Sequence, residues 1–194
     1  PRYLRSAAPE TYLKRAKRIA ERSPGFPWLE LATTKLALAD YYVYVESYSR
    51  ASSVYEEVWN DLSTDEDRLE LRDELLGQPR PIWTETLPPY TNGAAGAARR
   101  NEEVGSGIVT VIYDVSRRGR AQIREVETDP AEFTDIENMV EREVRRRVYR
   151  PVIVDGDSID SEPQIFTHEF SYSRSELDEL RGSSADAEQT AAKR

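Results

Sequence analysis

The chain has 194 residues, of which 38% are hydrophobic and 32% are charged, and its formal net charge is −9 at pH 7. The absence of cysteine excludes disulfides, thiolate metal ligands and cysteine nucleophiles, and the single histidine excludes most histidine-rich metal sites. Because an acidic chain is repelled by the phosphate backbone of nucleic acids, we expect no nucleic-acid partner.

Helical periodicity dominates residues 1–77. Apolar side chains recur every three or four residues over 9–22, 28–47 and 49–62, although the stripe of the second helix includes Lys35. Cap-type residues at 63–66 begin a fourth helix that ends near Gly77. The connections are short, so neighbouring helices are predicted to pack antiparallel.

The second and third of these helices resemble a tetratricopeptide repeat. The matching positions are Leu38, Ala39, Tyr42, Tyr48, Ala51, Tyr55 and Val58. Small residues at Ala39 and Ala51 would let the two helices approach closely. The resemblance implies a docking surface, for which the candidate residues are Tyr41, Tyr44 and Tyr48. A plain helical bundle has the same apolar spacing and stays an alternative.

Basic residues are concentrated at the beginning of the chain. Residues 1–22 hold seven basic side chains and two acidic ones. The simplest interpretation is a solvated helix face. The functional alternative is a basic patch that contacts an anionic membrane surface or an acidic partner, and its candidate residues are Arg15, Lys17, Arg18 and Arg22.

Residues 78–103 are predicted to connect two domains. Four prolines stiffen the first half, and a Gly- and Ala-rich run near 91–103 makes the second half flexible. Trp83, Leu87 and Tyr90 are unusually apolar for a free linker, so we expect them to pack against one of the domains.

The periodicity changes to that of strands in residues 104–173. Residues 107–115 are rich in β-branched and aromatic side chains, Gly119 permits a tight turn, and 120–127 alternates as a return strand. An amphipathic helix then carries the stripe Phe133, Ile136, Val140, Val144 and Val148. Tyr149-Arg150-Pro151 is predicted to end this helix, since proline disfavours helical geometry in the residue before it.

A turn around Asp155-Gly156 leads to a last strand over 164–172, and residues 174–194 are predicted to be a flexible tail. The fold class is therefore α+β, with an antiparallel helical region followed by a small β-β-α-β domain. In the last strand, Phe166, His168 and Phe170 should face the helix, and Thr167, Glu169 and Ser171 should face away from it.

Residues 104–173 resemble the C-terminal domain of the TonB family. The resemblance rests on the joint order of several features, namely the opening strand Gly107–Val115, the Gly119 turn, the helix ending in Tyr149-Arg150-Pro151, the Asp155-Gly156 turn, and a closing strand with Phe166, Phe170 and Tyr172. Leu87-Pro88-Pro89-Tyr90 lies where the family often has a proline- and tyrosine-containing approach segment.

The resemblance implies a periplasmic protein that interacts with other envelope proteins, such as outer-membrane transporter segments or inner-membrane motor components. Family members bind a short partner peptide as an extra strand beside the closing strand. An open sheet edge supplies unpaired backbone groups for such binding, although natural edges are often blunted. The candidate peptide-binding residues are Gln164, Ile165, Phe166, Thr167, His168, Glu169, Phe170, Ser171 and Tyr172.

No pattern of residues indicates catalysis. His168 lies between two aromatic positions and is predicted to be structural, and the carboxylates at 155, 157 and 160 lack the Gly and distal Glu of a calcium loop. We expect no enzyme activity, no metal site and no cofactor. A structural subunit of a large membrane-associated assembly is the alternative function, and a homodimer stays open.

Overall fold

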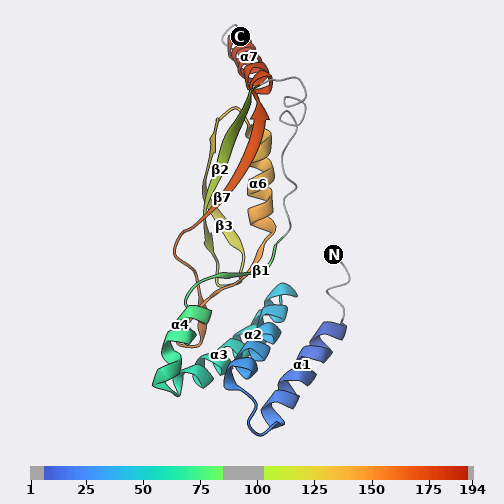
Figure 1. Cartoon of the computed structure of the whole chain (residues 1–194), viewed down its shortest axis with the longest axis vertical. Helices are drawn as coiled ribbons and strands as arrows, with labels where there is room; N and C mark the ends of the chain where they lie inside the picture. Colours follow the sequence, from blue (N-terminus) through green and yellow to red (C-terminus); the bar gives the residue numbers. More distant parts are fainter. Residues whose placement is uncertain (1–6, 85–102, 192–194) are drawn as a thin grey trace. The chain divides into compact units, whose positions relative to one another are not determined.

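The computed structural model describes residues 7–84 and 103–191, with side chains over 9–84 and 103–182. Most of the predicted connector, including Leu87 and Tyr90, lies outside these ranges. The fold is α+β, as predicted. A helical region is followed by antiparallel sheets and a final helix (Figure 1).

The described residues belong to two compact units that interleave along the chain. The helical unit combines the residues up to Thr84 with 114–122 and 146–163. The sheet unit combines residues 103–113, 123–145 and those from Gln164 onward. The predicted domains, 1–77 and 104–173, instead follow one another in sequence. The difference arises because two segments from the second half of the chain, 114–122 and 146–163, pack with the helices.

The helical unit contains α1 (Ala7–Arg22), α2 (Trp28–Tyr44), α3 (Tyr48–Ser63), a 3₁₀-helix (Glu66–Arg68) and α4 (Leu69–Leu76). Ala39 and Ala51, both almost completely buried, belong to one apolar cluster with side chains from α2, α3 and α4. Their small size allows the close approach of α2 and α3 that the sequence predicts. The other fully buried members include Tyr55, Val58, Leu62 and Leu76.

Strands that the sequence did not predict complete this unit. β1 (Arg80–Trp83) pairs antiparallel with β4 (Val148–Arg150), and β5 (Val152–Val154) pairs with β6 (Asp157–Ile159). The predicted connector therefore begins with a strand. The predicted helix was also too long, because α6 (Thr134–Arg146) ends before Val148. The β-branched and aromatic residues that follow take up strand pairing with β1 instead.

Two tight turns that the sequence predicts are present. Gly119 has a φ of 71°, and a Cβ there would lie 2.1 Å from the carbonyl oxygen of Tyr149, so only glycine fits. Asp155 and Gly156 have φ values of 53° and 85° and connect β5 to β6. Two consecutive residues with positive φ are what a two-residue hairpin with a type I′ turn requires.

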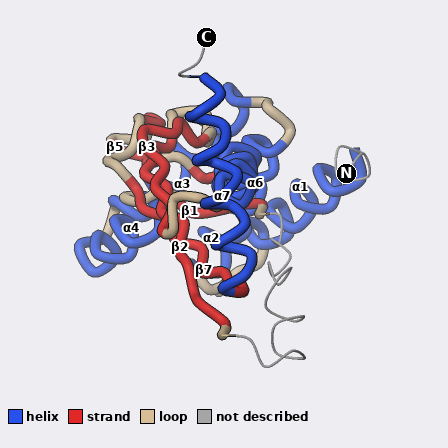
Figure 2. The backbone as a smooth tube through the Cα atoms, turned by 90° about the horizontal axis from the view of Figure 1, so that it is seen from above, coloured by secondary structure: helices blue, strands red, loops and turns tan. Residues whose placement is uncertain are grey.

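The sheet unit is built on three antiparallel strands in the order β3-β2-β7, where β2 is Val104–Val115, β3 is Ala121–Asp129 and β7 is Gln164–Ser173. β2 and β7 lie side by side in both general views (Figures 1 and 2). Alternate β2 residues are buried, among them Val109 and Val111, and α6 contributes a buried stripe and lies along the sheet (Figure 1). The predicted β-β-α-β core is therefore confirmed.

Aromatic rings pack directly over the backbone of β2. Gly107 lies opposite Phe170 and Gly105 lies opposite Tyr172 in the β2–β7 register. A Cβ at Gly107 would come within 2.3 Å of the Phe170 ring, and one at Gly105 within 2.6 Å of the Tyr172 ring. The absence of a side chain on β2 thus makes room for both rings, which also contact Phe133 with centroid separations of 5.1 and 4.8 Å.

The end of the chain differs from its prediction. In place of a flexible tail, the structure has α7 (Arg174–Ala191), which begins directly after β7. The backbone N–H of Glu176 donates to the Ser173 hydroxyl in its first turn, and Leu177 is buried. Arg181 also pairs with Glu132 at 2.7 Å. These contacts anchor the first part of α7 to the sheet unit.

Candidate functional site

β7 forms one border of the three-stranded sheet, which places all nine predicted peptide-binding residues on an edge strand. Ile165, Thr167 and Glu169 are exposed, and the exposed fraction of Ile165 reaches 69%. Phe166 and His168 are half-buried and Phe170 is buried, in agreement with the predicted inward face. Gln164, Ser171 and Tyr172 are half-buried.

The two borders of the sheet differ in charge. β3, at the opposite border, exposes Arg124, Glu125, Glu127 and Asp129. On β7 the exposed set contains a single charged residue, Glu169. Charged side chains on an edge strand are a common protection against pairing with another chain. By this criterion the β3 border is protected and the β7 border is the more suitable one for an added strand.

The predicted tyrosine surface is only partly brought together. Tyr41 and Tyr44 of α2 line one depression of about 400 Å³ together with Pro81, Ile82 and Trp83 of β1. Tyr48 does not line it, and its ring lies under the guanidinium of Arg118 instead. The expectation that Trp83 packs against a domain agrees with this position. The sequence did not indicate β1 as part of the surface. β1 is only four residues long and contains a proline, so its sequence does not have the pattern of a strand.

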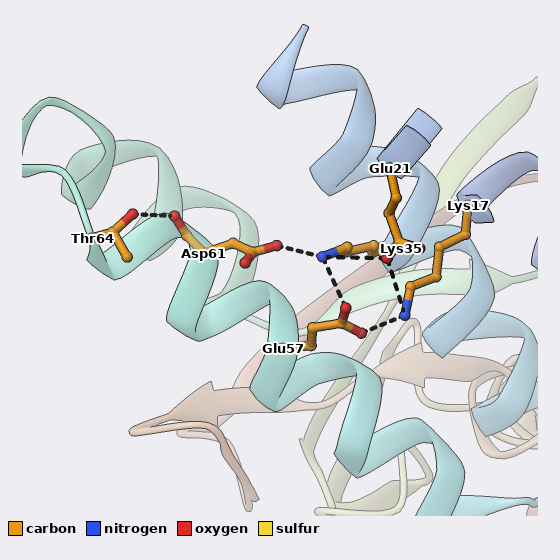
Figure 3. A network of polar contacts seen from close by, with 6 residues as sticks. All are labelled: Lys17, Glu21, Lys35, Glu57, Asp61 and Thr64. Atoms are coloured by element: carbon orange, nitrogen blue, oxygen red, sulfur yellow. Dashed lines mark hydrogen bonds and ion pairs between the residues drawn. The ribbon is translucent and has the colours of Figure 1, made fainter. Parts of the chain in front are cut away.

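The predicted basic patch divides into two groups. Arg15, Arg18 and Arg22 are exposed on α1. Lys17 instead points toward α3, where it pairs with Glu57 (Figure 3). Lys17 therefore belongs to a polar cluster that we call the lysine cluster, which consists of Lys17, Glu21, Lys35, Glu57 and Asp61.

Lys35 lies at the centre of the lysine cluster, and its side chain is only 6% exposed. Its ammonium group lies 2.6 Å from Asp61 and 2.9 Å from Glu57. Burial alone lowers the pKa of Lys35, but the two carboxylates outweigh that effect and raise it above its ordinary value. The lysine within an apolar stripe was the sequence signal for this buried ion pair.

A second buried cation joins segments that are far apart in the sequence. The Arg150 guanidinium donates to both carboxylate oxygens of Asp40, at 2.9 and 2.6 Å, and to the backbone carbonyl of Leu75 at 2.9 Å. The Tyr55 hydroxyl donates to the same carboxylate at 2.7 Å. Burial is the main reason why the pKa of Tyr55 is well above its ordinary value, and Asp40 adds to it. The sequence contained no signal for this site.

The surroundings of both buried cations are those of structural ion pairs. Each is surrounded by hydrogen-bond acceptors from neighbouring helices or strands, which is how buried charge is normally stabilised.

In the part of the chain that the structure describes, no group of three or more His, Asp or Glu side chains is arranged to hold a metal ion. Within the same ranges, none of the helices combines the length and the apolar character needed to cross a bilayer.

Comparison with known proteins adds no family assignment. No protein-family model matches the sequence, and comparison with curated proteins gives no match. The resemblance to the TonB family therefore stays a prediction.

Proposed function

We propose that this protein is a non-enzymatic interaction module of the cell envelope that binds an extended partner peptide as an added strand along β7. The observation that carries the proposal is the position of β7 at a sheet border where only one exposed side chain is charged. The sequence resemblance to TonB C-terminal domains supports the periplasm as the location and other envelope proteins as the partners.

Strand addition has a simple physical basis here. β7 is 10 residues long and pairs with β2 along one border, and an added strand would form its main-chain hydrogen bonds along the other border. Main-chain hydrogen bonds supply affinity in this binding mode, while neighbouring side chains supply specificity. Ile165 and Thr167 would contact a partner side chain on one face, and Phe166 would do so on the other.

The test is an NMR titration of the full chain with peptides as long as β7, taken from periplasmic segments of outer-membrane transporters. We expect backbone amide shifts that are concentrated in Gln164–Tyr172. A binding peptide is then prepared in two forms, N-methylated at alternate residues in one register or in the other. Because alternate amides of an added strand face β7, only one of the two forms should lose binding.

The two methylated peptides have the same side chains and length, so each serves as the control for the other. Equal loss or equal retention of binding by both forms would contradict strand addition. Shifts concentrated on β3, or on the depression lined by Tyr41 and Tyr44, would assign binding to another surface and would also refute the proposal.

A further inference from the structure

The two sides of α1 have different partners. One side faces the remainder of the helical unit, where Ala20 is buried, Lys17 pairs with Glu57 and the Glu10 carboxylate accepts from Tyr42. The other side is exposed and carries the three arginines of the predicted basic patch. We call this exposed side, formed by Tyr12, Arg15, Arg18, Ile19 and Arg22, the outer face of α1.

The outer face combines basic and apolar side chains in one helical register. Arg15, Arg18 and Arg22 follow each other at intervals of three and four residues, which places them in a row about 10 Å long. Tyr12 and Ile19 are seven residues apart and lie beside that row. Both are highly exposed for their type, at 71% and 54%.

The positive charges of the outer-face arginines are available to an anionic partner. Lys14 and Lys17 are paired with Glu10 and Glu57, respectively. No carboxylate within the described ranges forms an ion pair with Arg15, Arg18 or Arg22. Residues 1–22 hold seven basic side chains in a chain whose net charge is −9, so positive charge is concentrated at this end against the overall trend.

We propose that the outer face of α1 binds the surface of an anionic phospholipid bilayer. Clusters of basic residues on an amphipathic helix are attracted to anionic headgroups, and exposed tyrosine and aliphatic side chains enter the interfacial layer. Each arginine can bury its aliphatic stem there while its guanidinium stays at the headgroups. The contact is independent of the peptide-binding border of β7.

A bilayer fits this face better than an acidic protein helix does. An extended anionic plane meets the whole arginine row at once, whereas a helix that crosses α1 at the commonest packing angle meets only part of it. Within the given sequence, residues 1–9 add Arg2 and Arg5 and contain no acidic residue. The rest of the protein is acidic, but physiological salt screens its repulsion from an anionic bilayer beyond about 8 Å.

The experiment is co-sedimentation of the full chain with vesicles of phosphatidylcholine alone or of phosphatidylcholine mixed with phosphatidylglycerol. We expect binding only to the anionic vesicles, with a loss on addition of salt. The triple variant Arg15→Gln/Arg18→Gln/Arg22→Gln should bind on the order of 100-fold more weakly. Tyr12→Ser/Ile19→Ser should weaken binding further when combined with it.

The matched control is Arg117→Gln/Arg142→Gln/Arg145→Gln, which removes the same charge from exposed positions elsewhere. It should bind anionic vesicles within a few-fold of the unmodified chain, and circular dichroism checks that both variants are folded. Equal loss in both variants would overturn the proposal, as would undiminished binding by the α1 variant or equal binding to neutral vesicles. Binding of an acidic helical peptide without vesicle binding would also overturn it and would assign the face to a protein partner.

Discussion

The interiors of the two units are held together in different ways. In the helical unit, two buried cations, Arg150 and Lys35, make directional contacts with carboxylates. In the sheet unit, aromatic rings pack over glycines, and the contacts depend on shape. Ion pairs have a defined partner and geometry, so they can set the register between segments that are distant in sequence. Ring packing requires space, which the glycines of β2 provide.

The largest expected effect tests the ion pair between Arg150 and Asp40. Replacing Arg150→Met leaves the half-buried Asp40 carboxylate without its main partner, which should cost about 3–5 kcal/mol of unfolding free energy in urea denaturation. Arg145→Met is the matched control, because Arg145 is exposed and pairs with Glu141 on one helix. Its loss should cost less than about 1 kcal/mol.

A double variant sharpens this test. Asp40→Ala combined with Arg150→Met removes both charges, and it should be less destabilised than the sum of the two single variants. If Arg150→Met costs no more than Arg145→Met, the pair does not determine how β4 is attached to the helices, and the contrast between the two interiors fails.

The next effect concerns the glycines under the rings. Gly107→Ala places a methyl group where the Phe170 ring lies, so it should destabilise the chain by about 1–3 kcal/mol and weaken its near-ultraviolet circular dichroism. Gly182→Ala in α7 is the control, since a Cβ there meets nothing within 4 Å. It should be neutral or stabilise by up to about 1 kcal/mol. Equal behaviour of the two variants would contradict the role of space in the sheet unit.

The smallest effect is the pH dependence of the lysine cluster. Burial raises the pKa of Glu57, but Lys17 and Lys35 outweigh it and hold that pKa below its ordinary value of 4.5. A lowered folded-state pKa means that the contribution of Glu57 to stability is complete above about pH 4.5 and is lost as the pH falls through the lower value. This carboxylate is partly exposed, so the contribution is at most about 1 kcal/mol.

The measurement compares unfolding free energies of the unmodified chain and Glu57→Gln between neutral and acidic pH. The gap between them should be constant at neutral pH and should close as the pH drops below about 4.5. Glu125→Gln, at an exposed carboxylate on β3, is the control for the change from a carboxylate to an amide. A gap for Glu57→Gln that widens in acid would show that the sign of the effect is wrong.

Local patterns were sufficient for much of the fold. Helical spacing located α1, α2 and α3, and turn chemistry located Gly119 and the Asp155-Gly156 pair. The strand pattern and the apolar stripe predicted the three-stranded sheet with its helix. These predictions succeeded because each depends on residues that are close together in the chain.

The predictions that failed concern short segments whose partners are distant. β4 was assigned to the end of a helix, since Val148 continues the apolar stripe of α6. Its pairing with β1 could not be inferred, because neither strand exceeds four residues. The predicted basic patch also combined residues in different environments. Only the structure shows that Lys17 pairs with α3, whereas the three arginines are exposed.

The sequence by itself therefore determined the α+β class, the helical pairs and the tight turns, because periodicity and glycine placement are local properties. Only the tertiary structure decided that residues 146–163 pack with the helices and that Arg150 meets Asp40, 110 residues away along the chain. The physical reason is that a buried charge is stabilised by whichever opposite charge the fold brings next to it. The separation of two residues along the chain does not predict that pairing.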